Sequence, residues 1–158
     1  IVMTPKSLLR LPAAASSLDQ LTSGGFAALI DDADLTDANK VERIVFCSGK
    51  VFYDLTDARR KTEERRVALI RVEQFYPFPR TALTEAVARY PHATDLVWCQ
   101  EEPKNMGGWT FMEGKFEDLI PGGDRLRYVG RAESPSPATG SISRACSRRC
   151  CCWRLPVS

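Results

Sequence analysis

The chain has 158 residues, and its 22 lysine and arginine residues against 20 aspartate and glutamate residues give a formal net charge of +2. This length allows one domain with a buried core, and no apolar run approaches the ~20 residues of a membrane span. The last fourteen residues contain three arginines and no acidic residue, so the rest of the chain has 19 basic and 20 acidic side chains. This balance does not indicate the basic surface of a nucleic-acid-binding domain.

The first forty residues show little regular pattern. The chain begins with Ile1 rather than methionine, which we expect of a fragment. The short apolar run at residues 8–15 is interrupted by Arg10, so it is not a secretory signal peptide. Residues 17–20, Ser-Leu-Asp-Gln, have the pattern of a capping box and predict a short helix that ends before the glycines at 24–25.

Four aspartates crowd the loop that follows, at positions 31, 32, 34 and 37. Their spacing superficially resembles a calcium-binding loop. The position that requires glycine is occupied by Asp37, and no glutamate closes the loop. We therefore expect no metal site here.

From residue 41 onward, apolar runs alternate with helical spacings. We predict strands at 43–47, 67–72, 96–99 and 126–129, and helices after residues 49, 79 and 108, the last of them ended by Pro-Gly-Gly at 121–123. Ser48 is the expected cap of the first of these helices. The inward-facing residues are expected to be Val51, Leu55 and Ala58 in the first helix, Leu83, Val87 and Tyr90 in the second, and Met112, Phe116 and Leu119 in the third. The β-α-β-α-β-α-β order predicts an α/β fold with three layers, a mostly parallel sheet covered by helices on both faces.

The stretch from Trp98 to Trp109 leaves the end of a predicted strand, where ligands or partner surfaces gather in open α/β sheets. An ordinary solvated loop is one interpretation of its Glu-Glu pair. The other is a docking surface against further domains or a partner subunit, with the two tryptophans supplying apolar area and the glycines permitting close approach. The interface residues of that second hypothesis are Glu101, Glu102, Asn105, Gly107, Gly108 and Trp109.

Catalytic chemistry is hard to find in this sequence. The segment from Cys47 to Lys50 lies where a phosphate loop would lie, but it lacks the first glycine and the Ser/Thr of that motif. His92 is the single histidine and reads as a loop residue, while Cys47 and Cys99 fall within strands and read as small buried residues. We therefore predict no catalytic, cofactor-binding or metal-binding residue in this chain.

Several motifs nevertheless appear in an order that matches a known family. They are MTPKSLLR (3–10), CSGKVFYD (47–54), RVEQFYPFP (71–79), VWCQEEPKN (97–105) and YVGR (128–131) followed by SPSPATG (134–140). Over about residues 1–144 the chain resembles the carboxyl-terminal part of the thiamine diphosphate-dependent first component of the 2-oxoglutarate dehydrogenase complex. The resemblance implies a transketolase-like carboxyl-terminal domain.

The resemblance also implies a functional context. The enzyme is a homodimer of the citric-acid cycle that decarboxylates 2-oxoglutarate on thiamine diphosphate and passes succinyl to the lipoyl arm of the succinyltransferase component. Preceding domains hold the cofactor with Mg²⁺, so the fragment lacks the active site and supplies assembly. A bacterial cytoplasm is the expected location, or the mitochondrial matrix in a eukaryote. The resemblance leaves open whether an acyl-CoA or AMP effector, known in relatives, binds this domain.

On this basis the chain divides into three parts. Residues 1–40 would be the end of the pyrimidine-binding domain and a linker, residues 41–144 the transketolase-like domain, and residues 145–158 an aberrant tail. The tail is rich in Arg and Cys and departs from the family pattern, so we expect it to be disordered, through a reading-frame shift. A redox-sensitive or metal-binding tail is the alternative.

A second hypothesis of a different class remains open. The same α/β sheet could form a free-standing effector-binding or assembly module without catalysis. The upstream coding sequence separates the two hypotheses, because only the first requires it to continue into a thiamine diphosphate motif.

Overall fold

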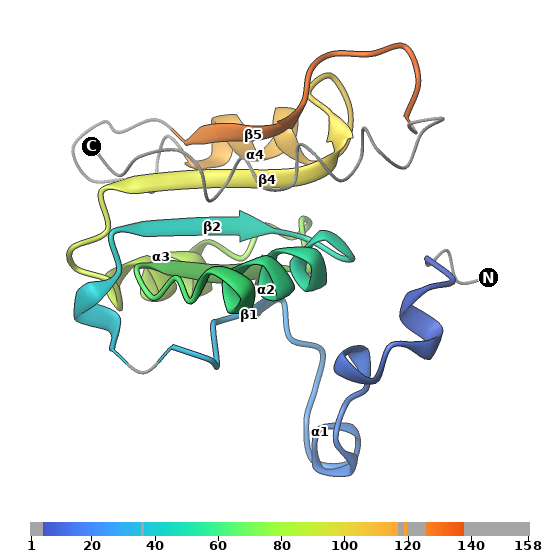
Figure 1. The fold of residues 1–158 in the computed structure, drawn as a ribbon, viewed down its shortest axis with the longest axis vertical. Helices are drawn as coiled ribbons and strands as arrows, with labels where there is room; N and C mark the ends of the chain where they lie inside the picture. The colour runs from blue at the N-terminus through green and yellow to red at the C-terminus, as the bar shows by residue number, and fades with distance from the viewer. Residues whose placement is uncertain (1–4, 36, 117–118, 120–125, 138–158) are drawn as a thin grey trace.

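A computed structural model describes residues 5–35, 37–116, 119 and 126–137, and a five-stranded sheet forms its centre (Figure 1). The strands lie in the order β1-β3-β2-β4-β5. β2, β3, β4 and β5 run parallel to one another, and β1 pairs antiparallel with β3 at one edge. The bounds are β1 Leu29–Ile30, β2 Arg43–Cys47, β3 Val67–Val72, β4 Asp95–Pro103 and β5 Arg127–Arg131.

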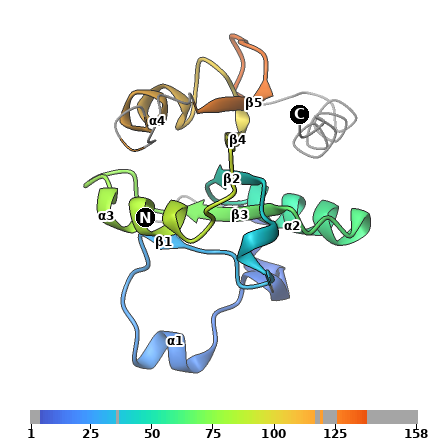
Figure 2. The same ribbon diagram turned by 90° about the vertical axis from the view of Figure 1, so that its left-hand side faces the viewer.

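Helices cover both faces of this sheet (Figure 2). α2 (Val51–Thr62) packs on one face, where Val51 and Leu55 meet a buried cluster that includes Val45 and Val97. α3 (Arg80–Ala88) and α4 (Trp109–Phe116) pack on the other face. Successive side chains of a strand point to opposite faces, so the buried runs of β2 and β3 contribute to both cores.

The core on the α3 and α4 face is the larger of the two. Leu83 of α3 and Met112 and Phe116 of α4 are fully buried there, with Phe46 and Trp98 from the sheet. The Phe46 and Phe116 rings meet edge to face, with centroids 4.7 Å apart. Burial of such large side chains contributes about 1.5–3 kcal/mol each, which makes this face the main source of stability.

The predicted alternation of strands and helices is confirmed, and with it the three-layer α/β fold. The predicted inward residues pack against the cores, apart from Ala58, which is half-buried while its neighbour Arg59 is buried. Tyr90 and Leu119 do so from positions beyond the ends of α3 and α4. Three details differ: β1 was not predicted, β4 continues beyond its apolar run to Pro103, and Ser48 does not cap α2. The helix begins later, with Lys50 in the capping position, after a turn at Gly49 whose φ is +66°.

Before the sheet, the chain forms an arm of residues 5–27 that stands away from the three layers (Figures 1 and 2). It contains two 3-10 turns and the short helix α1, at Leu8–Arg10, Pro12–Ala14 and Leu18–Thr22. The predicted capping box of α1 is confirmed, with both the Ser17 and the Gln20 side-chain bonds in place. A third 3-10 turn, Ala38–Lys40, leads into β2.

Some predictions lie outside the described residues. These are the helix stop at residues 121–123 and the tail at 145–158. The division of the chain at residues 40 and 144 remains a prediction, although β1 shows that residues 29–30 belong to the sheet. Within the described part of the chain, no helix is long and apolar enough to cross a membrane.

Candidate functional site: the carboxyl edge of the sheet

The loop between β4 and α4 is organised by Gln100, a residue that the sequence did not single out. Its side chain is 7% exposed, and its Oε1 accepts hydrogen bonds from Trp98 Nε1 at 2.8 Å and from the Trp109 backbone N at 3.0 Å. Its Nε2 donates to the carbonyl oxygens of Pro103 and Met106, at 3.2 and 2.6 Å. One buried amide therefore fixes the strand end, the turn and the start of the helix.

The two glycines of the loop are required within the domain. Gly107 has a φ of +71°, and a Cβ there would lie 2.9 Å from Nε2 of Gln100. A Cβ at Gly108 would lie 2.8 Å from ring atoms of both Phe75 and Trp98. The glycines thus allow α4 to lie close against the sheet.

An ion-pair network ties the same edge to α2. Lys50 Nζ lies 2.7 Å from Glu101 of β4 and 3.3 Å from Asp54 of α2. Burial would lower the pKa of Lys50, but its hydrogen bond and ion pair with Glu101 outweigh burial and raise the pKa. The lysine of the phosphate-loop-like segment is therefore held by carboxylates of its own domain.

The other polar residues of the loop lie at the surface. The side chain of Asn105 donates to the Ser134 carbonyl oxygen at 3.2 Å and accepts from the Ser134 backbone N at 3.1 Å. Glu102 and Lys104 are exposed. The Glu102 carbonyl oxygen accepts a bond from the Tyr128 hydroxyl at 3.1 Å, which joins the loop to β5.

The two tryptophans do not supply exposed apolar area, which corrects the argument made from the sequence. Trp98 and Trp109 are only 1% and 5% exposed. Trp98 packs in the core beneath α4, and the Trp109 ring lies 5.2 Å from that of Tyr128. Of the six residues assigned to an interface, Glu102 and Asn105 keep exposed side chains, and Glu101 is half-buried in its pair with Lys50.

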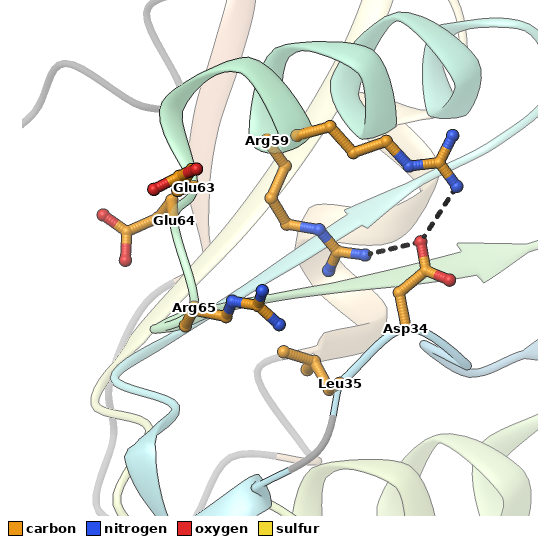
Figure 3. A pocket seen from close by; sticks show the side chains of 7 residues that line it. Asp34, Leu35, Arg59, Glu63, Glu64 and Arg65 are labelled. Atoms are coloured by element: carbon orange, nitrogen blue, oxygen red, sulfur yellow. Dashed lines mark hydrogen bonds and ion pairs between the residues drawn. The ribbon is translucent and has the colours of Figure 1, made fainter.

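The acidic loop that contains Asp32 and Asp34 joins the sheet to α2 by ion pairs rather than forming an ion-binding site. The Asp32 side chain is 3% exposed, pairs with Arg59 of α2, and accepts a bond from the Leu69 backbone N at 2.8 Å. Asp34 lies 3.4 Å from Arg59 and 3.3 Å from Arg60, beside a surface pocket of about 340 Å³ into which Arg65 also points (Figure 3). Asp32 and Asp34 are thus engaged by arginines.

Asp31 makes the matching contact on the opposite face of the sheet. It accepts a hydrogen bond from the Tyr90 hydroxyl at 2.8 Å and pairs with Arg89 at 2.8 Å. Burial, and then this hydrogen bond, raise the pKa of Tyr90. The adjacent residues Asp31 and Asp32 therefore connect the end of β1 to the helical layers on both faces of the sheet. The calcium-like spacing of the aspartates did not predict this role.

The remaining candidate residues lie where the sequence predicted. His92 is exposed in a turn, and Cys47 and Cys99 are buried in β2 and β4. Over the described ranges, no group of three or more His, Cys, Asp or Glu side chains could hold a metal ion.

Taken together, the fold and this edge define a three-layer α/β domain whose strand ends are bound to its own helices by ion pairs and amide bonds. Sequence comparison identifies the family of this domain. The chain belongs to the 2-oxoglutarate dehydrogenase C-terminal family, whose model matches residues 15–149.

Curated relatives agree with this assignment. The chain is 50% identical over 143 residues to the 2-oxoglutarate dehydrogenase E1 component of Haemophilus influenzae, and 46% identical over 144 residues to that of Cupriavidus necator. The E1 component of Geobacillus kaustophilus is 46% identical over 142 residues. These alignments cover 89–91% of this chain but only 15% of each relative, so the chain spans about 15% of the length of these proteins.

Proposed function

We propose that this chain is the carboxyl-terminal domain of a thiamine diphosphate-dependent 2-oxoglutarate dehydrogenase, in which it supports assembly of the enzyme rather than the chemical step. The family match over residues 15–149 carries this proposal. The whole enzyme would decarboxylate 2-oxoglutarate and transfer succinyl to lipoamide. Its partners would be a second subunit and a lipoyl-bearing succinyltransferase, in the cytoplasm of a bacterium.

The carboxylates of the carboxyl edge and of the acidic loop do not fit thiamine diphosphate with Mg²⁺. A magnesium diphosphate site needs carboxylate or amide oxygens that are free to bind the ion. At the carboxyl edge Glu101 is held by Lys50, and in the acidic loop Asp32 is held by Arg59. We therefore assign the cofactor to the preceding part of the longer polypeptide.

The assembly surface that we propose is the exposed rim of the β4–α4 loop, made by Glu102, Lys104 and Asn105. Gln100 holds the backbone of this rim, so its exposed side chains are presented on a rigid support. The polar composition of the rim suits the border of an interface, where ion pairs and hydrogen bonds set orientation more than affinity.

The rim is tested with Glu102→Gln in the full-length enzyme, and Glu85→Gln serves as the control because Glu85 is exposed on α3. We expect weaker dimerisation or a lower melting temperature for Glu102→Gln, with nearly normal turnover per intact dimer. Sedimentation and steady-state kinetics measure these quantities. An intact dimer with turnover reduced about a hundredfold, or 2.7 kcal/mol in the barrier, would instead place Glu102 in the chemistry.

The cofactor assignment is tested by calorimetry. The 158-residue chain should not bind thiamine diphosphate in the presence of Mg²⁺, whereas the full-length enzyme should bind it. Micromolar binding by the short chain, equivalent to about −8 kcal/mol, would contradict the assignment of the cofactor to other domains.

A further inference from the structure

The arm of residues 5–27 carries most of the large exposed apolar side chains in the described part of the chain. Leu9, Leu18, Leu21 and Phe26 are 70–79% exposed. The other two are Tyr76 and Phe111, in the body of the domain. Apolar side chains gathered on one segment mark an interaction surface, whereas scattered ones are ordinary.

The helix at the centre of the arm cannot sustain itself. α1 has five residues, and none of them is buried. Isolated helices shorter than about 12–15 residues are marginal in water, because the first turn is costly to nucleate. The capping box satisfies two backbone groups but buries no apolar surface. The order of α1 therefore requires a surface that covers Leu18 and Leu21.

The body of the domain does not provide that surface. Between the arm and the body lies an open hollow of about 710 Å³, lined by Leu21 and Phe26 on one side and by Phe52 and Arg71 on the other. α1 is the part of the arm that lies farthest from the sheet (Figure 2). Beyond its end the arm is fastened to the body, where β1 and Asp32 join the sheet.

The comparisons indicate what covers the arm. The matched family is a carboxyl-terminal one, and the chain covers 15% of the length of its relatives, so most of such a polypeptide lies on the amino-terminal side of this arm. A surface on the same polypeptide meets the arm at a high effective concentration, because the two are tethered. The arm has few charges, Lys6, Arg10 and Asp19, so an apolar partner surface suits it.

We propose that Leu18, Leu21 and Phe26 dock the arm onto the preceding part of the same polypeptide. The proposal rests on the proposed function, since it requires this chain to be the end of a longer one. In this arrangement the ion pairs of Asp31, Asp32 and Asp34 connect the segment after β1 to the helices of the body. The apolar arm contacts the preceding domains. The arm would thus set the position of this domain relative to the rest of the enzyme.

Hydrogen exchange of the arm amides tests the proposal in the full-length enzyme and in the 158-residue chain. We expect the α1 amides to exchange at least about tenfold more slowly in the full-length enzyme. The double variant Leu18→Asp/Leu21→Asp should abolish this protection in the full-length enzyme and lower its melting temperature. Thr81→Asp/Thr84→Asp, which adds the same two charges at exposed positions of α3, should change neither quantity.

Other outcomes overturn the proposal. Equal exchange of the arm amides in the two proteins would show that nothing in the preceding polypeptide covers the arm. Self-association of the short chain that Leu18→Asp/Leu21→Asp removes would identify a second copy as the occupant. Neither outcome depends on turnover or cofactor binding, so failure of the docking proposal is distinguishable from failure of the enzyme assignment.

Discussion

At the scale of single residues, Gln100 shows how one buried polar group can determine the shape of a functional edge. Its amide accepts from two N–H groups and donates to backbone carbonyls, so its hydrogen-bonding capacity is fully used. The sequence offers no signal for this, because a glutamine after an apolar run reads as the first residue of a polar loop. Its partners become visible only when β4 and α4 are packed together.

We predict that Gln100→Leu destabilises the 158-residue chain by about 2–4 kcal/mol. The substitution leaves Trp98 Nε1 and the Trp109 backbone N without an acceptor, and each unsatisfied buried donor costs ~1–3 kcal/mol. Urea unfolding measures the loss. Asn105→Ala is the control, because its bonds to Ser134 lie at the surface and their loss costs about 1 kcal/mol or less. Equal losses in the two variants would contradict the central role of Gln100.

At the scale of elements, the sequence was most informative where the pattern is local. The apolar runs at 43–47 and 67–72 predicted β2 and β3 because both strands are buried on both faces. β1 was missed because two residues carry no periodicity, and its place is set by pairing with Val72 and Arg71. The cap of α2 was wrongly assigned to Ser48 because the sequence does not show that the chain turns at Gly49 before the helix begins.

The candidate site follows the same division between local and long-range signals. The sequence located the β4–α4 loop, since the change from apolar to polar residues and the glycine pair are local features. It could not reveal that Glu101 pairs with Lys50, 51 positions away, or that Asp32 pairs with Arg59, 27 positions away. Such pairs depend on the strand order, which no local spacing encodes.

Gly108, directly before α4, and Gly114, within α4, provide an element-scale prediction. We expect Gly108→Ala to destabilise the chain by about 1–3 kcal/mol, because the new Cβ would lie 2.8 Å from the Phe75 and Trp98 rings. Gly114→Ala should stabilise it by about 0.5–1 kcal/mol, because no heavy atom lies within 4 Å and alanine favours the helix. Thermal unfolding compares the two. A stabilising Gly108→Ala would show that α4 can move away from the sheet at little cost.

At the scale of the whole molecule, ion pairs lie at both ends of the parallel strands. At the amino edge, Asp95 of β4 pairs with Arg43 of β2 and with Arg127 of β5, so three adjacent strands share one carboxylate. At the carboxyl edge, Lys50 joins β4 to α2. The strands are therefore held in register at both ends, and the stability of the whole sheet is linked to the protonation of a few groups.

The Asp95 cluster predicts how the global stability depends on pH. Burial raises the pKa of Asp95, but the hydrogen bonds and charges of Arg127 and Arg43 outweigh burial and lower the pKa below its ordinary value. The unfolded chain then binds the proton more readily than the folded chain. The contribution of this cluster to the free energy of unfolding is therefore complete above the ordinary carboxyl pKa of about 3.9, and it is lost as the pH falls through the lower folded value.

Asp95→Asn separates this contribution from the rest of the acid transition. At pH 7 the variant should be less stable by about 1–3 kcal/mol, since Arg43 is 2% exposed and loses its carboxylate while Asp95 itself keeps some solvent contact. The difference from the parent should shrink as the pH falls below about 4, because the parent then protonates Asp95. Urea unfolding between neutral and acid pH measures both curves.

Glu64→Gln is the control. Burial raises the pKa of Glu64, but the hydrogen bonds and charge of Arg66 outweigh burial and lower the pKa. Because Arg66 is half-exposed, Glu64→Gln should change the free energy of unfolding less than Asp95→Asn does. A constant difference between Asp95→Asn and the parent at every pH would show that Asp95 acts through packing rather than charge.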